Sequence, residues 1–142
     1  MDADVVIVER LSLLRDNVDY LKTESVAAHT FREYTGNVRL KKAVERSLHV
    51  AVETCLDIAR HVIAREGFRF PHDYQDAFRI LAEEQIVSQG LLPSLLDMAR
   101  FRNLIVHDYA RIDDAKVYEI LKRRLGDFDA FAAAIVAYLG AA

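Results

Sequence analysis

Residues 100–109 carry the side chains of this chain that are best suited to chemistry. Arg102, Asn103, His107 and Tyr109 lie within eight residues of an otherwise apolar segment. Histidine side chains take up and release protons near neutral pH, and the planar fork of arginine can bind two oxygens of a phosphate group. The segment is therefore the place where the sequence offers acid–base chemistry at a phosphate.

Helical geometry limits how these side chains can meet. Because each residue of an α-helix advances by about 100°, Arg102 and Tyr109 lie within about 20° of one face, whereas His107 lies about 140° from Arg102. One straight helix therefore cannot direct all three side chains at one target. Either the helix unwinds near His107, or a two-fold dimer brings a second copy of the segment to complete the site.

A structural interpretation of the same residues stays open. A single histidine on a half-apolar helix is more often a surface or hydrogen-bonded residue than a catalytic one. Arg102 could pair with an acidic side chain, and Tyr109 could close the hydrophobic core.

Charge is distributed unevenly along the 142 residues. The formal net charge is −3 and the pI is about 5.9, which argues against a chain dedicated to coating nucleic acid. Residues 100–124 nevertheless hold seven basic and four acidic side chains, a balance of +3, so the rest of the chain carries −6. A local anion-binding site is therefore compatible with the acidic average.

The elements that must position this segment are helices. The chain has only five Gly and two Pro, which is few for a protein of short strands and turns, and its hydrophobic fraction of 52% suffices for a folded core. Apolar residues repeat at helical spacing along the chain. We therefore predict an all-α protein, a single domain over residues 1–142 folded as an antiparallel bundle of four to five helices.

Local signals mark the ends of the first four helices. The first helix is expected to continue to about residue 33, before a break at 36–37. The second begins near residue 40 and ends at Gly67, a favourable residue at a helix C-terminus. Asp73 can cap a short third helix, and Pro93 suits the first turn of a fourth.

The last part of the chain is predicted as a fifth helix. Asp113 or Asp114 can open it, and its apolar residues continue to Tyr138. Gly126 can kink or split this helix, with Asp127 as the cap of the piece that follows.

Cysteine content and the ends of the chain bear on the compartment. Cys55 is the only cysteine, so neither an intramolecular disulfide nor a cysteine-rich zinc site can form, and its place on an apolar stripe predicts a core residue. The N-terminus is acidic where a signal peptide is basic, and the longest uncharged apolar run, residues 131–142, is shorter than the ~20 residues of a membrane span. We expect a cytoplasmic protein with no membrane contact, no cofactor and no metal.

The segment from Arg102 to Tyr109 resembles a known family. It matches the Arg-x4-His-x-Tyr motif of the HEPN superfamily, and specifically of the HepT toxins. Residues 45–59 resemble the second helix of that family, and residues 78–81 and 117–121 also fit. The resemblance extends over nearly the whole chain.

The resemblance implies a fold, an activity and partners. HEPN domains are helical bundles that form two-fold dimers, and in many of them the motif Arg and His of both subunits line a shared cleft that cleaves RNA without a metal. HepT toxins are paired with a small nucleotidyltransferase antitoxin, MntA, which silences them by transferring AMP groups to the motif tyrosine, here Tyr109. The implied partners are thus RNA, an MntA-like antitoxin and a second copy of the chain, which can join the antitoxin in a larger hetero-oligomer.

The residue types suit these implied roles. We expect His107 to act as acid and base, and Arg102 to clamp the phosphate as negative charge develops on it. Asn103 would orient His107 or the substrate, and Tyr109 would bond a phosphate oxygen and accept the AMP group. An AMP group there adds bulk and negative charge beside Arg102, and both oppose RNA entry.

Two alternatives accompany this interpretation. The chain could be a non-catalytic helical module that partners a nucleotidyltransferase, which its acidic pI allows. The run Lys122-Arg123-Arg124 could extend a track for the RNA backbone, although a solvated helix face is the more common role of such a run.

Overall fold

The computed structural model describes residues 3–141. In this part of the chain the regular elements are helices, with no strand, which confirms the predicted all-α class. The long helices are α1 (Ala3–Ala27), α3 (Val38–Glu66), α5 (Leu92–His107) and α7 (Leu125–Ala141). The shorter elements are α2 (Phe31–Thr35), α4 (Tyr74–Glu83), a 3₁₀ turn (Tyr109–Arg111), α6 (Asp114–Glu119) and a π-helical segment (Ile120–Arg124).

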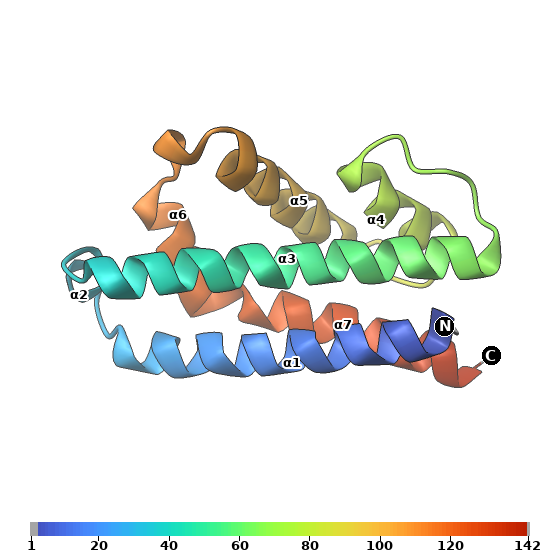
Figure 1. The fold of residues 1–142 in the computed structure, drawn as a ribbon, viewed down its shortest axis with the longest axis horizontal. Coiled ribbons are helices and arrows are strands. Elements are labelled where there is room, and N and C mark those ends of the chain that lie inside the picture. Colours follow the sequence, from blue (N-terminus) through green and yellow to red (C-terminus); the bar gives the residue numbers. More distant parts are fainter. Residues whose placement is uncertain (1–2, 142) are drawn as a thin grey trace.

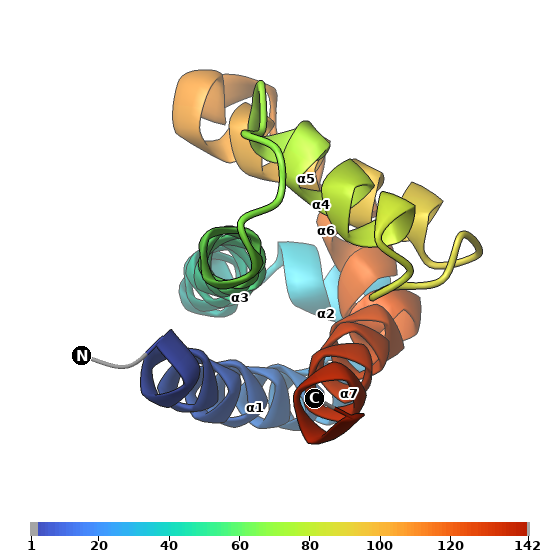
Figure 2. The same cartoon turned by 90° about the vertical axis from the view of Figure 1, so that its right-hand side faces the viewer.

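The long helices run side by side along the molecule. α1 and α3 are antiparallel neighbours, and α7 returns beside α1, so that both ends of the chain lie at the same end of the bundle (Figure 1). α4 and α5 lie across the molecule from α1, packed on α3 (Figure 2). None of the helices within residues 3–141 has the length and apolar character needed to cross a bilayer. The helix that carries the candidate segment, α5, is thus held against α3 and α4.

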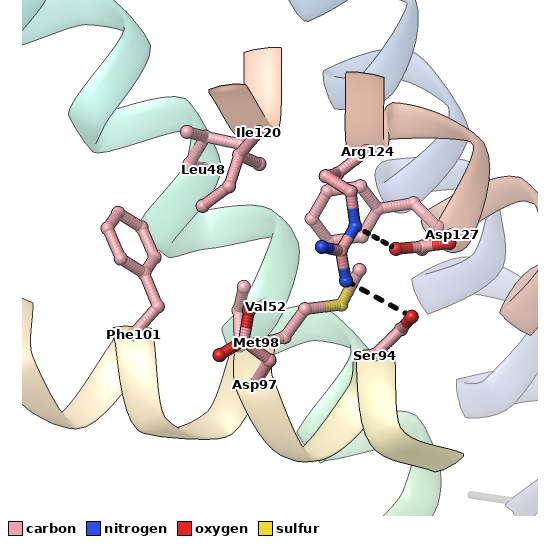
Figure 3. Close-up of a pocket in the computed structure, with 10 residues that line it drawn as sticks. Leu48, Val52, Ser94, Asp97, Met98, Phe101, Ile120, Arg124 and Asp127 are labelled. Carbon is pink, nitrogen blue, oxygen red and sulfur yellow. Dashed lines mark hydrogen bonds and ion pairs between the residues drawn. The ribbon is translucent and has the colours of Figure 1, made fainter. Parts of the chain in front are cut away.

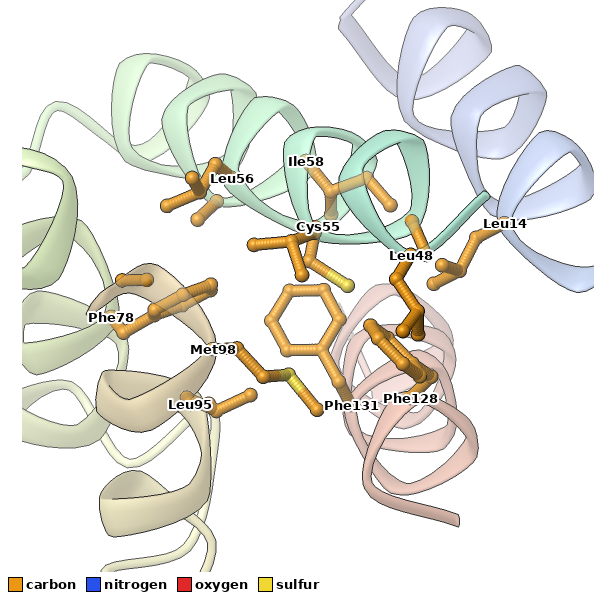
Figure 4. Close-up of a cluster of buried hydrophobic side chains, with 14 of the residues drawn as sticks. Leu14, Leu48, Cys55, Leu56, Ile58, Phe78, Leu95, Met98, Phe128 and Phe131 are labelled. Carbon is orange, nitrogen blue, oxygen red and sulfur yellow. The ribbon is translucent and has the colours of Figure 1, made fainter. Parts of the chain in front are cut away.

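A core of aliphatic and aromatic side chains fills the space between α3, α5 and α7 (Figure 4). The rings of Phe78 and Phe131 meet edge to face, with their centroids 5.8 Å apart. Cys55 is fully buried beside them, which confirms its predicted place in the core. Burial raises the pKa of the Cys55 thiol, because the thiolate would lose its hydration there.

Several of the predicted helix ends are confirmed. Gly67 ends α3 with a φ of 71°, in the left-handed region that glycine adopts without steric cost. Asp73 caps α4 and Asp113 caps α6, each by accepting a backbone N–H of the first turn, at 2.7 and 2.9 Å. Pro93 lies in the first turn of α5.

The first helix is shorter than predicted. It ends at Ala27 rather than near Glu33, and a separate short helix, α2, follows. Thr30 Oγ1 accepts the backbone N–H of Glu33 at 3.1 Å, while the Glu33 carboxylate accepts the backbone N–H of His29 at 3.2 Å. This reciprocal cap starts a new helix, which places Tyr34 in the core.

The predicted break at Gly126 is wrong. α7 runs through Gly126 without interruption, and the irregular segment lies before it, at residues 120–124, as a π-helix. Asp127 does not cap a helix; its carboxylate accepts the Arg124 Nε–H at 2.9 Å. The backbone adjusts in the π turn, so the conformational freedom of the glycine is not used.

The end of α5 changes the direction of the motif after His107. The helix ends at His107, and Asp108 has left the helical region, with φ −148° and ψ 54°. Tyr109 then begins the 3₁₀ turn that leads toward α6. The helix therefore unwinds at His107, and Arg102 and Tyr109 are no longer constrained to one helical face.

Candidate active site

Arg102 is the best-anchored member of the motif. It lies in the third turn of α5, where its side chain enters the space between α3 and α4, and the residue is only 9% exposed. Its Nε donates to the Glu53 carboxylate, and its terminal nitrogens donate to Asn103 Oδ1 at 3.2 Å and to the Tyr74 hydroxyl at 3.4 Å. The guanidinium also stacks on Tyr74, 4.1 Å from the ring centroid.

These contacts leave part of the guanidinium available. Arginine has five N–H groups, and each of the three bonds uses one of them. Within residues 3–141, one N–H group on each terminal nitrogen therefore has no hydrogen-bond partner. Two such groups together form the edge of the guanidinium that can bind two oxygens of a phosphate. Arg102 thus does pair with an acidic side chain, as the structural interpretation of the motif predicted. This ion pair is compatible with binding an anion.

His107 has a different environment. It is the last residue of α5 and is exposed, and within residues 3–141 its imidazole forms no hydrogen bond or ion pair. No hydrogen bond among residues 3–141 joins His107 to Arg102 or Asn103, and Asn103 Oδ1 accepts from Arg102. Within one chain, the motif thus separates into a buried arginine side and an exposed histidine side.

Tyr109 does not close the core. The residue is 58% exposed, and its hydroxyl donates to Oε2 of Glu45 at 3.2 Å. Glu45 itself is 8% exposed, in the second turn of α3. The negative charge of Glu45 raises the pKa of the Tyr109 phenol, while the positive charge of Lys41 acts against this shift.

One face of α3 receives both motif residues. Glu45, His49 and Glu53 follow one another at intervals of four residues, so they share a face of the helix. Glu45 binds Tyr109 and Glu53 binds Arg102, and the His49 imidazole lies 3.4 Å from Glu53. The sequence analysis did not identify Glu45, His49 and Glu53 as part of the site. The spacing of the two glutamates along one face of an otherwise apolar helix could have indicated it.

The basic run at 122–124 is not one continuous surface. Figure 3 shows that Arg124 turns toward α5, where it donates to Ser94 at 3.1 Å, and it also donates to Asp127 of α7 at 2.9 Å. The cavity beside it holds about 10 Å³, too little for a ligand. Arg123 is exposed and forms no ion pair within the described residues. Arg124 therefore serves the bundle rather than a nucleic acid track.

Other cations of the +3 segment also have carboxylate partners. Lys116 lies 2.8 Å and Arg100 3.6 Å from Asp97, and Arg111 lies 3.2 Å from Asp108. The local excess of positive charge is thus divided among separate ion pairs. Within residues 3–141 we find no cluster of three or more His, Cys, Asp or Glu side chains with the arrangement of a metal site.

Comparison with known proteins identifies the same family that the motif resembles. The model of the family described as "Ribonuclease HepT-like" matches residues 12–135. The mRNA nuclease HepT of Shewanella oneidensis is 30% identical over 99 residues, which cover 70% of this chain and 74% of that one. The tRNA nuclease HepT of Aphanizomenon flos-aquae is 25% identical over 136 residues, 95% of this chain and 90% of that one.

Solved structures share the fold. The tri-AMPylated Shewanella oneidensis HEPN toxin, in complex with MNT antitoxin, superposes with a TM-score of 0.85 at 24% identity, covering 96% of this chain and 99% of that one. The cytosolic protein YutE of Bacillus subtilis superposes with a TM-score of 0.73 at 20% identity, covering 92% and 90%. Together with the match over residues 12–135, these findings confirm the resemblance that the motif indicated, and the chain belongs to the HepT-like ribonuclease family.

Proposed function

We propose that this chain is the toxin of a toxin–antitoxin pair, an endoribonuclease that cleaves RNA without a metal. The observation that carries the proposal is the Arg102 guanidinium, fixed by Glu53 and Tyr74 with its terminal N–H groups partly unused. Arg102 lies on the helix that ends in the exposed His107, whose imidazole has no partner within residues 3–141. Relatives named mRNA nuclease and tRNA nuclease support RNA as the substrate.

The reaction assigns one role to each side chain. A base must take the proton of the ribose 2′-hydroxyl as that oxygen attacks the phosphorus, and an acid must protonate the leaving 5′-oxygen. Imidazole can do either, so His107 is the acid–base group. Arg102 binds the phosphate oxygens as the phosphorane gains negative charge. Asn103 supports Arg102 through its Oδ1 contact, and the exposed Tyr109 can bond a phosphate oxygen.

A two-fold dimer completes this site. One chain offers a single motif histidine, which it exposes on the side of α5 away from the buried Arg102. Two copies of α5 facing each other across a two-fold axis would supply two histidines, one for the base and one for the acid. Val106, which is exposed beside His107, gives this turn apolar surface for such a contact.

Silencing follows from the exposure of Tyr109. We propose that an MntA-like nucleotidyltransferase antitoxin transfers AMP to this hydroxyl, as the tri-AMPylated toxin in complex with MNT antitoxin suggests. Each AMP adds a negative charge and a bulky nucleoside on the same end of α5 as His107, which opposes the entry of RNA. The dimer and its antitoxin would form a hetero-oligomer in the cytoplasm, the compartment in which the YutE neighbour is described.

A non-catalytic module is the second candidate, because the Arg102–Glu53 ion pair would also serve a purely structural role. Expression of the chain alone separates the two. The toxin is supported if the wild-type chain arrests growth and His107→Ala does not. His29→Ala, which changes an exposed histidine elsewhere, should still arrest growth. The module is supported, and the toxin contradicted, if cells grow normally with wild type, His107→Ala and His29→Ala and if all three bind the transferase equally.

A further inference from the structure

The Tyr109 hydroxyl meets a carboxylate of its own chain. It donates its proton toward Oε2 of Glu45 at 3.2 Å, and Glu45 is almost completely buried while Tyr109 is 58% exposed. Because the proton points into the protein, the lone pairs of the phenolic oxygen are directed away from Glu45. The hydroxyl is therefore oriented as a nucleophile is oriented by a general base.

The groups around Glu45 leave its carboxylate to Tyr109. Tyr34 of α2 is fully buried, and its hydroxyl has no hydrogen-bond partner within the described residues. Burial and the charge of Glu45 both raise the pKa of Tyr34, which keeps that phenol protonated. Lys41 of α3 is held by Asp114 of α6 at 2.8 Å, and its positive charge acts on the Tyr109 phenol.

We propose that Glu45 is the base for the modification of Tyr109, so that the toxin supplies part of the chemistry that silences it. This inference rests on the proposed AMP transfer. The phenolic oxygen attacks the α-phosphorus of a nucleoside triphosphate held by the transferase, and an O–P bond forms. The bond from the α-phosphorus to the oxygen that bridges the α- and β-phosphorus atoms breaks, and pyrophosphate leaves. The phenolic proton passes to Glu45.

Physical chemistry explains why the phenol needs such a group. The charge of Glu45 raises the pKa of Tyr109, so the phenol is not ionised near neutral pH and its oxygen is a weak nucleophile. A carboxylate already in hydrogen-bond contact can remove the proton as the O–P bond forms. His49, one turn along α3, is directed to Glu53 at 3.4 Å and does not compete for this role.

The chain contains a matched control. The Tyr138 hydroxyl donates to Glu66 at 2.6 Å, so a second tyrosine–glutamate pair joins α7 to the end of α3. Glu66 is exposed, unlike Glu45, and it lies at the opposite end of α3 from Glu45. Glu66→Gln therefore removes the same kind of carboxylate from the same kind of contact without touching Tyr109.

The test is the single-turnover rate of AMP incorporation, measured by intact-protein mass with the cognate nucleotidyltransferase, ATP and Mg²⁺ between pH 6.5 and 9. Near pH 7 we expect Glu45→Gln to lower the rate roughly 100-fold or more, and Glu66→Gln to leave it unchanged. The rate of Glu45→Gln should rise by about tenfold per pH unit as the phenol ionises, whereas the wild-type rate should change little. Equal unfolding curves for both variants ensure that the comparison is between folded proteins.

Different results overturn different claims. If Glu45→Gln is labelled as fast as wild type, or is slower by the same factor at every pH, then Glu45 only positions the hydroxyl and the inference is wrong. If wild type is not labelled, or Tyr109→Phe is labelled equally, Tyr109 is not the acceptor. That result overturns the proposed modification, and this inference with it, while leaving the RNA-cleavage proposal to its own test.

Discussion

The Arg102 guanidinium lies between the Glu53 carboxylate, which accepts its Nε–H, and the ring of Tyr74, 4.1 Å from its centroid. The three residues come from three helices, α5, α3 and α4. The position of the phosphate clamp therefore depends on how these helices pack, and a change in any one of them should move the arginine.

Removing the charge of Glu53 should weaken both folding and catalysis. Glu53→Gln leaves the mostly buried Arg102 without an ionic partner, which should cost about 1–3 kcal/mol of unfolding free energy. It should also lower kcat for RNA cleavage about tenfold, because the guanidinium loses its fixed orientation. Urea unfolding and steady-state cleavage check these values. Asp16→Asn, which alters an exposed pair with Arg15, is the control, and an equal effect of the two substitutions would refute the positioning role.

The sequence predicted the helices better than it predicted this site. Gly67, Asp73 and Pro93 act through backbone conformation and caps within a few residues, so their effects can be read locally. The partners of the motif residues cannot be predicted from neighbouring residues in this way. Glu53 precedes Arg102 by 49 residues and Glu45 precedes Tyr109 by 64, so only the packing of α3 on α5 and the 3₁₀ turn brings them together.

The two wrong boundaries have similar causes. The first helix was predicted to continue past Ala27 to the break at 36–37, but the reciprocal cap of Thr30 and Glu33, with burial of Tyr34, starts a separate helix there. The π segment at 120–124 accommodates Arg124 against α5, a contact that no local pattern encodes. In the sequence, Gly126 indicated a kink, but the backbone departs from α-helical geometry before that residue.

Acid should weaken the support of α4, the helix that carries Tyr74. Two hydrogen bonds from Arg69, at 2.7 and 2.9 Å, lower the pKa of Asp76 in the folded chain, and the backbone N–H of His72 adds to this. Unfolded aspartate titrates near pH 3.9, so Asp76 stabilises the fold above about pH 4 and loses this contribution as pH falls through its lower folded pKa.

Asp76→Asn should therefore cost about 2 kcal/mol at neutral pH and progressively less below about pH 4. Unfolding by urea at about pH 7 and pH 3 measures the difference. Asp129→Asn, which alters an exposed pair with Lys22, should have little effect at either pH. A cost for Asp76→Asn that is the same at both pH values would contradict the assigned ion pair.

Adjacent arginines should respond differently to truncation. Arg124→Ala removes contacts with Asp127 and Ser94 across two helices and should lower the free energy of unfolding by about 1–2 kcal/mol. Arg123→Ala removes an exposed side chain and should change it by less than about 0.5 kcal/mol. Thermal or urea unfolding of the two variants provides the comparison. Equal stability of the pair would mean that the Arg124 contacts contribute nothing to the fold.

The central claim, RNA cleavage by Arg102 and His107 without a metal, is tested most directly by incubating the purified chain with RNA in excess EDTA. Wild type and the control His29→Ala should cleave, while His107→Ala and Arg102→Ala should lose activity by roughly 100-fold or more with unchanged helical content. Cleavage that persists in His107→Ala would contradict the account. So would wild-type cleavage that EDTA abolishes and an added divalent cation restores.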